Sequence, residues 1–265
     1  MTIRVEKSPG LARSLIDRAD KKNAMSLDMW EALPGILIQA MSPPAIRALE
    51  LTAADPEAAF CAGADIGEML ANKDNPEWLA RKQAAINRAQ HMLPRLPVPT
   101  VAFINGDCIG GGAGLAMACD IRVAAPSARF GITPARLGLV YPLHDVKLLT
   151  DLVGPGQAKR LLYTGKLIDA AEAQRIGLVE EIADASGPMI EAILAASPYS
   201  QSMAKGFVRR VLEGEYEDDA FSLRMFAEAF ERPDFAEGAS AFVEKRKPNF
   251  ARPSECDSAN KTPSE

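Results

Sequence analysis

Phe60-Cys61-Ala62-Gly63-Ala64-Asp65-Ile66 and Ile109-Gly110-Gly111-Gly112-Ala113-Gly114 are the two most informative stretches of this chain. The three consecutive glycines run into Leu115-Ala116-Met117-Ala118-Cys119, which predicts a tight turn leading directly into a helix. The first N–H groups of a helix have no internal partner and lie at its positive end. Glycine lets a ligand oxygen approach them without meeting a Cβ. A Gly-Gly-Gly run alone is more often a turn than a site, but two such segments can supply two backbone donors to one oxygen, which is an oxyanion hole.

Composition limits the classes of protein to consider. The 265 residues are 48% hydrophobic and 25% charged, as in a globular protein of one or two domains. The formal net charge is -5 and the longest basic run is Lys245-Arg246-Lys247, which argues against a nucleic-acid partner. The four cysteines form no C-x-x-C pair, so we expect no metal site and no disulfide framework. With neither a signal peptide nor a membrane-spanning stretch, the sequence favours a cytoplasmic protein.

Short strand-like runs alternate with helical patterns along the first 190 residues, which predicts α/β layering. The expected strands are Ile46–Leu51, Thr100–Ile104, Asp120–Val123 and Leu178–Ile182. The expected helices are residues 76–93, 146–153, 156–163 and 170–176, with a hinge at Gly154-Pro155-Gly156 between the second and third. We therefore expect a core over residues 1–190, a helical region for oligomerisation over 191–250, and a disordered tail over 251–265.

The chain resembles the enoyl-CoA hydratase/isomerase family, the crotonases, over roughly residues 12–250. Five segments match the family's motifs in the family's order: Asp20–Ser26, Phe60–Ile66, Cys108–Asp120, Gly154–Val179 and Glu237–Pro248. The resemblance implies a crotonase-like spiral of ββα units, a helical C-terminal region that packs between subunits, and a homotrimer or hexamer. It also implies a coenzyme A thioester as substrate, with no other cofactor and no metal.

The resemblance also assigns roles to individual residues. The oxyanion-hole N–H groups would be those of Ala64 and Gly111, which would hold a thioester carbonyl as it becomes an enolate. Phe242 and Lys245 would come from a neighbouring subunit. The implied substrate-binding residues are Lys21, Lys22, Ala24, Ala62, Asp65, Ile66, Gly110, Gly114, Thr133, Pro134, Phe242 and Lys245.

The sequence departs from the family at the two positions that matter most for hydration. Hydratases of this family carry one glutamate on the helix after the glycines and a second in an F-G-x-P-E segment, and the two hold and activate water. Here these positions are Gly114 and Pro134, and neither residue can transfer a proton. The two-glutamate mechanism therefore cannot be carried over, and the isomerase mechanism, which uses the second acid, is affected equally.

Three alternatives remain open at this point. Thr133–Tyr141 resembles a segment of the methylmalonyl-CoA decarboxylase branch, and decarboxylation suits a site without carboxylates. Tyr141 could then orient the substrate carboxylate or deliver a proton, although that branch has a histidine at the position of Ala64 and keeps an acid on its helix. The chain could instead be a non-catalytic acyl-CoA binding protein, or an assembly partner of another acyl-CoA enzyme.

Three neighbouring side chains are candidates for the missing chemistry. Tyr141 is either a functional hydroxyl or a core tyrosine whose O–H needs a partner. His144 and Asp145 are adjacent, so at most one of them faces the site. We favour Asp145 as a helix N-cap and His144 as a base, since histidine titrates near neutrality. The resulting catalytic set is Ala64, Gly111, Tyr141 and His144.

Overall fold

A six-stranded sheet forms the centre of the chain, in the order β1-β2-β3-β4-β6-β9. These strands are β1 (Ile3–Ser8), β2 (Gly10–Ile16), β3 (Ile46–Ala53), β4 (Thr100–Ile104), β6 (Ile121–Ala124) and β9 (Glu181–Ile182). The first two form an antiparallel hairpin, and every later pairing is parallel. The computed structural model describes residues 3–43 and 45–250, so the predicted tail over 251–265 lies outside the described residues.

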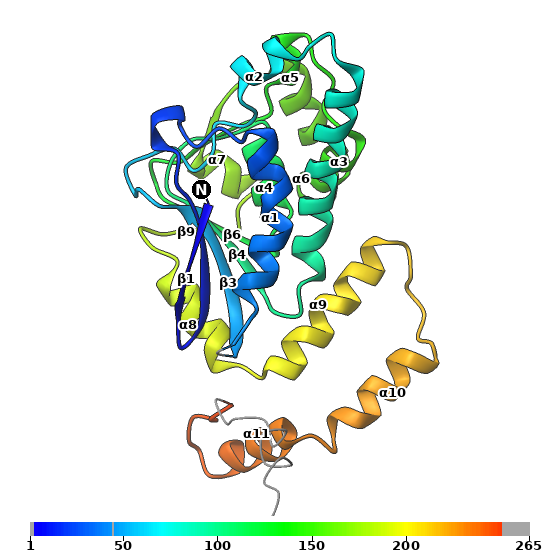
Figure 1. The fold of residues 1–265 in the computed structure, drawn as a ribbon. Coiled ribbons are helices and arrows are strands. Elements are labelled where there is room, and N and C mark those ends of the chain that lie inside the picture. Colours follow the sequence, from blue (N-terminus) through cyan, green and yellow to red (C-terminus); the bar gives the residue numbers. More distant parts are fainter. Residues whose placement is uncertain (1–2, 44, 251–265) are drawn as a thin grey trace, which may run out of the picture.

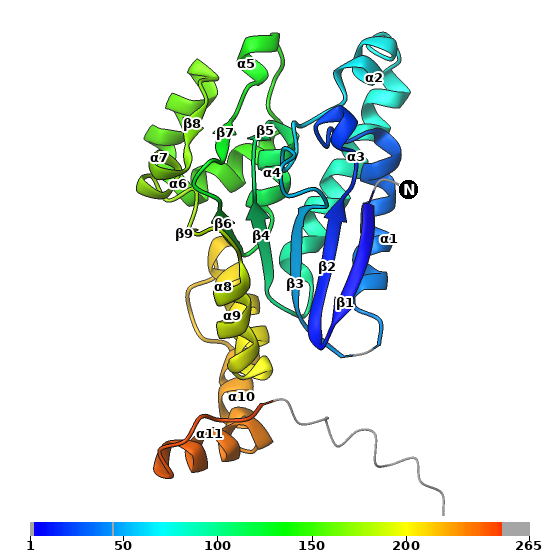
Figure 2. The same cartoon turned by 90° about the vertical axis from the view of Figure 1, so that its left-hand side faces the viewer.

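A second, three-stranded sheet lies beside the first and carries part of the glycine region. It consists of β5 (Cys108–Ile109), β7 (Arg129–Gly131) and β8 (Ile168–Asp169), with β7 in the middle. The pairing of β5 with β7 is parallel and that of β7 with β8 antiparallel. Figure 2 shows these short strands above and beside the ends of β4 and β6. This mixed α/β arrangement agrees with the predicted fold class.

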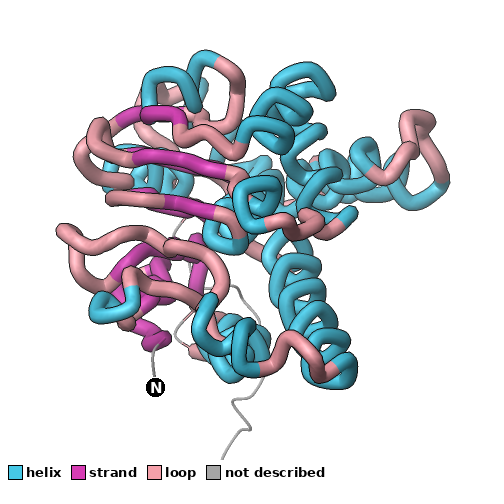
Figure 3. The backbone as a smooth tube through the Cα atoms, turned by 90° about the horizontal axis from the view of Figure 1, so that it is seen from above, coloured by secondary structure: helices cyan, strands magenta, loops and turns pink. Residues whose placement is uncertain are grey.

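Two long helices cover one face of the main sheet (Figures 1 and 2). Helix α1 (Leu27–Ala40) begins at Ser26, whose side chain accepts a hydrogen bond from the Met29 N–H. Helix α3 (Pro76–Met92) begins at Asn75 in the same way. Its apolar spacing predicted the helix, and Pro94 shortly after Met92 predicted its end. Trp30 of α1 is among the largest fully buried side chains of the core. Seen from above, the strands lie mostly on one side of the body and most helices on the other (Figure 3).

The remaining elements connect the sheets and surround the glycine segments. They are η1 (Ala19–Lys21), α2 (Ile66–Ala71), η2 (Leu93–Arg95), α4 (Gly111–Met117), α5 (Pro134–Leu137), α6 (Leu143–Thr164) and α7 (Ala170–Arg175). Helix α6 covers both of the short helices predicted between residues 146 and 163. The chain leaves helical geometry inside it at Gly154 (φ 72°, ψ 164°), which is the predicted hinge.

The C-terminal helices leave the body as an extended arm (Figure 1). Helix α8 (Gly187–Ala195) still belongs to the core, because Ile190 and Ile193 pack against Val101 and Val123 on the second face of the sheet. The predicted boundary at residue 190 therefore falls inside a helix that packs on the sheet. Helices α9 (Pro198–Leu212), α10 (Ala220–Ala229) and α11 (Pro233–Val243) then form the arm.

The arm exposes many large apolar side chains to solvent in the single chain. Phe226, Phe230 and Phe242 are 66%, 55% and 85% exposed. Apolar surface of this extent commonly marks an interface between proteins. Of the helices in the described ranges, none combines the length and hydropathy needed to cross a bilayer.

Candidate functional site

The two glycine segments lie directly against each other in the structure. Cys61 and Cys108 form a parallel bridge, with the Cys61 N–H donating to the Asp107 carbonyl and the Ile109 N–H to the Cys61 carbonyl. A Cβ on Gly63 would lie 2.7 Å from the Ile109 carbonyl oxygen, and the residue has a φ of +96°. Only glycine meets both conditions without strain. The close approach of the loops therefore depends on this residue.

Two backbone N–H groups are free where these loops meet. In the bridge between Met25 and Ala64, the Met25 N–H donates to the Gly63 carbonyl and the Asp65 N–H to the Met25 carbonyl, so the Ala64 N–H points away from Met25. Gly111 is the first residue of α4. Within residues 3–43 and 45–250, no atom accepts a hydrogen bond from either N–H. A Cβ on Gly111 would lie 3.8 Å from the Ala64 nitrogen, so the two donors are close neighbours. Such a pair suits a carbonyl oxygen that gains negative charge.

A cavity of about 220 Å³ opens at these two donors. Its wall is largely apolar, and its polar side chains come from Lys82, Gln83, Thr133, Tyr141 and Asp145. The apolar wall consists of Ile66, Met69, Trp78, Leu79, Ile86, Pro134, Leu137, Leu139, Val140 and Pro142. Backbone from Ala62 to Ala64 and from Gly110 to Gly111 completes it. The structure therefore places eight of the residues predicted from the sequence on one cavity: Ala62, Ala64, Ile66, Gly110, Gly111, Thr133, Pro134 and Tyr141.

Lys82 is a buried cation in the cavity wall. Its Nζ lies 3.5 Å from Glu68 Oε2 and 4.7 Å from the centre of the Trp78 ring. Burial lowers the pKa of Lys82, and Glu68 partly opposes this effect. Glu68 also accepts hydrogen bonds from the Leu27 N–H at the start of α1. The charge of Lys82 is thus balanced by a carboxylate that the fold itself holds in place.

Tyr141 lies on the cavity with its hydroxyl already engaged. The hydroxyl donates a hydrogen bond of 2.9 Å to the carbonyl oxygen of Gly110, and the side chain is buried. Burial and the nearby carboxyl of Asp145 raise the pKa of Tyr141 well above its ordinary value. The tyrosine therefore stays protonated at neutral pH and connects the glycine turn to Asp145.

Asp145 contributes a carboxyl group to the cavity wall. The sequence had not indicated it as a site residue. Helix α6 begins at Leu143 after Pro142, so Asp145 lies inside the first turn and is not the N-cap that the sequence suggested. Its Oδ1 accepts a hydrogen bond of 2.8 Å from Gln90 Nε2 of α3. Burial raises the pKa of Asp145 from 3.8 to about 6, with the hydrogen bond from Gln90 opposing the shift. Such a carboxyl changes its protonation state near neutral pH.

His144 faces away from the cavity, contrary to the expectation that it, rather than Asp145, turns toward the site. Its ring lies against His91 of α3, with ring centres 4.3 Å apart. Burial and the neighbouring His91 lower the pKa of His144. Within the described residues its Nε2 has no hydrogen-bond partner. Adjacent positions on a helix diverge by about 100°, so the turn that brings Asp145 inward carries His144 outward.

The remaining predicted contacts do not line this cavity. Asp65 caps α2 and pairs with Arg18 at 2.9 Å, and the hydrogen bond from the Glu68 N–H lowers its pKa most. The Ala24 carbonyl accepts a hydrogen bond from Arg18. Lys21 is exposed on the adjacent turn. Phe242 lies in α11 and Lys245 follows that helix, and neither residue lines the cavity. Figure 1 shows α11 at the far end of the arm from α2 and α5.

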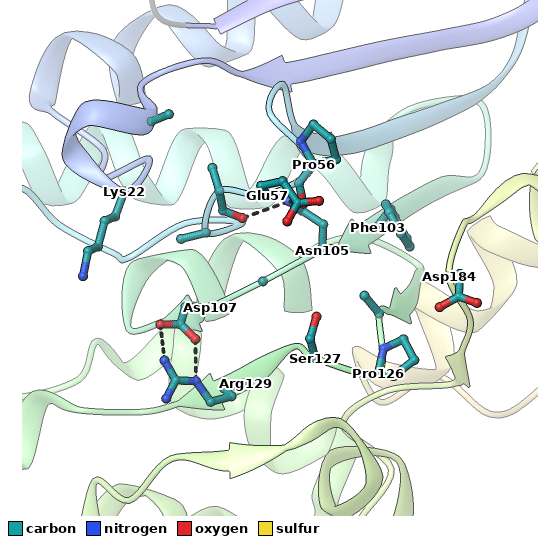
Figure 4. Close-up of a pocket in the computed structure, with 15 residues that line it drawn as sticks. Lys22, Pro56, Glu57, Phe103, Asn105, Asp107, Pro126, Ser127, Arg129 and Asp184 are labelled. Atoms are coloured by element: carbon teal, nitrogen blue, oxygen red, sulfur yellow. Dashed lines mark hydrogen bonds and ion pairs between the residues drawn. The ribbon is translucent and has the colours of Figure 1, made fainter.

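A larger hollow of about 740 Å³ lies near the carboxyl ends of β3, β4 and β6. Figure 4 shows Lys22 at one side of it, and Asp107 paired with Arg129 through two hydrogen bonds of 2.8 Å. Asn105 in its wall donates to the carbonyls of Asp55, Pro56 and Ala58. Its lining does not include Ala64 or Gly111, which carry the two free N–H groups, so we do not assign the chemistry to it.

The buried thiols do not add a reactive group. Cys61, Cys108 and Cys119 are free and buried. Burial raises the pKa of Cys61 and of Cys119 to about 12, so both remain neutral thiols. In the described part of the chain, no group of three or more histidine, cysteine or acidic side chains is arranged to hold a metal ion.

Comparison with known proteins agrees with the geometry. The family model for enoyl-CoA hydratase/isomerase matches residues 6–253. A short-chain-enoyl-CoA hydratase from Clostridium acetobutylicum is 34% identical over 251 residues, covering 92% of this chain and 95% of that protein. A crotonyl-CoA hydratase from Syntrophomonas wolfei is 34% identical over 255 residues, covering 93% and 96%.

Solved structures show the same fold. A family protein from Hyphomonas neptunium has a TM-score of 0.89 at 34% identity, covering 94% of this chain and 97% of that one. The enoyl-CoA hydratase from Bacillus anthracis has a TM-score of 0.84 at 33% identity, covering 95% and 99%. This chain belongs to the enoyl-CoA hydratase/isomerase family. It is accordingly an enzyme of acyl-CoA metabolism by family, and the fold is the predicted crotonase-like one.

Proposed function

We propose that this chain acts on an acyl-CoA thioester through an enolate, and that the N–H groups of Ala64 and Gly111 form the oxyanion hole. The observation that carries the proposal is the pair of free donors at the mouth of a mostly apolar cavity. The thioester oxygen would accept both N–H groups as it gains charge. Donors fixed in advance in this way contribute several kcal/mol to such a step. The names of the relatives, which are hydratases of short-chain and crotonyl thioesters, support the substrate class.

The cavity favours a short acyl group. Its volume of about 220 Å³ lies below the range of about 300–1,000 Å³ that is usual for drug-sized ligands. Leu79, Ile86 and Leu137 would pack against the hydrocarbon chain of the acyl group. Lys82 in the cavity wall forms an ion pair with Glu68. We therefore place short, unbranched acyl chains first among the substrates to be tested.

Coenzyme A itself would lie outside the cavity. We propose Lys21, Lys22 and the backbone near Ala62 and Ile66 as its contacts, because these segments join the mouth of the cavity to exposed lysines. In a homotrimer or hexamer, Phe242 and Lys245 of a neighbouring subunit would complete the binding surface. Their distance from the cavity of their own chain is what supports this assignment (Figure 1).

The decarboxylase alternative loses its main support. It assumed a site without carboxylates, whereas Asp145 lies on the cavity wall. An ionised Asp145 would repel the carboxylate that a decarboxylase must bind. Proton transfer at carbon, as in isomerisation or hydration, has no such conflict and is the reaction class that we favour.

Incubation with a panel of acyl-CoA thioesters in heavy water tests the proposal. The panel contains butyryl-CoA, crotonyl-CoA, vinylacetyl-CoA and methylmalonyl-CoA, and products are followed by mass spectrometry. Deuterium at the α-carbon, a shifted double bond or added water would support enolate chemistry. Loss of carbon dioxide from methylmalonyl-CoA would restore the decarboxylase. Binding of several thioesters with no change in any of them would replace the enzyme with a non-catalytic binder.

A further inference from the structure

Gly114 and Asp145 share one small volume inside the cavity wall. A Cβ built on Gly114 would lie 2.0 Å from Asp145 Oδ1 and 2.5 Å from Gln90 Nε2. No side chain fits there while the carboxylate is in place. The resemblance described above implies a glutamate of hydratases at the Gly114 position. In this chain the acidic group that occupies that volume comes from α6 instead of α4.

A hydrogen bond from α3 holds the carboxylate in that place, and Tyr141 lies beside it. Gln90 of α3 donates to it at 2.8 Å, and the Tyr141 hydroxyl, which donates to the Gly110 carbonyl, lies next to it. Gln90 is fully buried, and its Oε1 has no partner within the described residues. If the Gln90 amide turned over, its Oε1 would accept a proton from a neutral Asp145 carboxyl, so both protonation states of Asp145 have a hydrogen-bond partner.

The location is also right for chemistry at the thioester. Gly111, whose N–H is one of the two free donors, lies three residues before Gly114 on α4. Residues three apart on a helix are neighbours, with side-chain origins about 5–6 Å apart. The Asp145 carboxylate, which occupies the Cβ position of Gly114 and lines the cavity, is therefore within one helical turn of the Gly111 donor.

We infer that Asp145 is the general acid–base of this site and takes the place of the glutamate that the chain lacks at position 114. The inference rests on the proposed function, because it needs a thioester held by Ala64 and Gly111. The carboxylate removes a proton from a carbon next to the carbonyl. The C–H bond breaks, and its electron pair moves into the enolate whose oxygen the two N–H groups stabilise. If the neutral acid exchanges its proton with solvent before it protonates the same carbon, solvent hydrogen enters at that carbon. In a thioester with a β,γ double bond the enolate is conjugated, and protonation at its γ-carbon instead shifts the double bond to the α,β position.

The pH dependence of this step follows from the groups around Asp145. Tyr141 precedes it on the adjoining loop, and Gln90 of α3 is a neutral partner. The paired Lys82 and Glu68 come from α3 and α2, and His144 and His91 lie together away from the cavity. Cys108 of β5 is a buried neutral thiol beside Tyr141. The base form of Asp145 is required, so the rate should fall as pH drops below about 6.

Asp145→Asn is the direct test, with Asp151→Asn as a matched control. Asp151 lies on the same helix, six residues further on, where it is exposed and pairs with Lys147. For each full-length variant, the rate of deuterium uptake by butyryl-CoA is measured from pH 5 to 8, and the Kd for the same thioester by calorimetry. Near-ultraviolet circular dichroism checks that the variants are folded.

The expected result is a loss of about 100-fold or more in uptake by Asp145→Asn, the usual effect of removing a general base. We expect no change in Kd, and wild-type rates in Asp151→Asn. The wild-type rate of uptake should fall below about pH 6, where Asp145 loses its base form. The residual rate of Asp145→Asn should not show this fall. Uptake that survives in Asp145→Asn, or an unchanged acid limb, would overturn the inference while leaving the proposed function intact. Absence of uptake and turnover in the wild type would instead remove the proposed function.

A second variant keeps the inference testable if Asp145→Asn does not fold. Gly114→Ala leaves the carboxylate in the chain but places a methyl group where its oxygen lies. The carboxylate must then move, and uptake should fall by at least about 10-fold with the apparent pKa of the acid limb altered. Normal uptake in Gly114→Ala would contradict the assignment of that location to the reacting group.

Discussion

Replacing Asp145 by asparagine should make the protein more stable at neutral pH. The buried carboxyl has its pKa raised from 3.8 to about 6, which means that the folded chain favours the neutral form. Above pH 6 the folded chain must bear the ionised group in an environment that disfavours it. Asparagine is always neutral and can hydrogen-bond to the free Oε1 of Gln90, so this penalty disappears.

The size of the effect follows from the same two values. They differ by about two pH units, and each unit corresponds to about 1.4 kcal/mol between the two protonation states. The penalty on wild-type stability is therefore about 3 kcal/mol at pH 8, roughly half that at pH 5, and gone below 3.8. Between pH 3.8 and 6 the folded chain holds a proton that the unfolded chain has lost, so stability rises as the pH falls.

Urea denaturation of wild type and Asp145→Asn at pH 5, 6, 7 and 8 measures the difference in the free energy of unfolding. Other titrating groups act equally on both proteins and cancel in the difference. Protein concentration is held constant, because oligomer formation would contribute to apparent stability. A variant that is less stable than wild type at pH 8, or a difference that does not shrink between pH 8 and pH 5, would refute the reasoning.

Three further changes test other parts of the structure. Gly111→Pro removes one donor at the first position of α4, where proline is compatible with a helix, and should lower turnover about 100- to 1,000-fold; near-normal turnover would exclude its N–H from the oxyanion hole. Glu180→Ala leaves the buried Arg122 without its carboxylate partner and should lower the free energy of unfolding in urea by about 1.5–3 kcal/mol. Thioester binding should not change, and an unchanged urea midpoint would show that the Arg122–Glu180 pair does not contribute to stability. Phe226→Glu places a charge on the apolar arm and should reduce the mass measured by light scattering, whereas a wild-type mass would place the subunit contact elsewhere.

Local sequence patterns predicted the parts of the fold that local physics decides. The apolar spacing before Pro94 marked α3, and the short strand-like run Thr100–Ile104 marked β4 at its observed limits. Gly154 was expected to interrupt a helical stretch and does so. The convergence of the Gly63 and Gly111 segments was expected from their glycines, and the structure brings them together. The strand expected over 178–182 shortens to Glu181–Ile182, since only that part pairs with β6.

The acid of the cavity was missed because its direction depends on tertiary packing. Asp145, Leu149 and Val153 recur at four-residue steps and all are buried, so together they form the inward face of α6. That spacing can be read from the sequence, but His144, Leu148 and Leu152 have the same four-residue spacing and predict a different inward face of the helix. Only the packing of α6 against α4 and α3 decides between the two faces. A general preference for histidine near neutral pH could not replace that information.

Because one small space serves both positions, a side chain at position 114 and the Asp145 carboxylate in its present place exclude each other. A lineage that carries a side chain on α4 has no room for a carboxylate from α6, and the reverse holds here. Under the proposal above, inspection of position 114 alone would class this chain as lacking an acid, although Asp145 supplies one from α6.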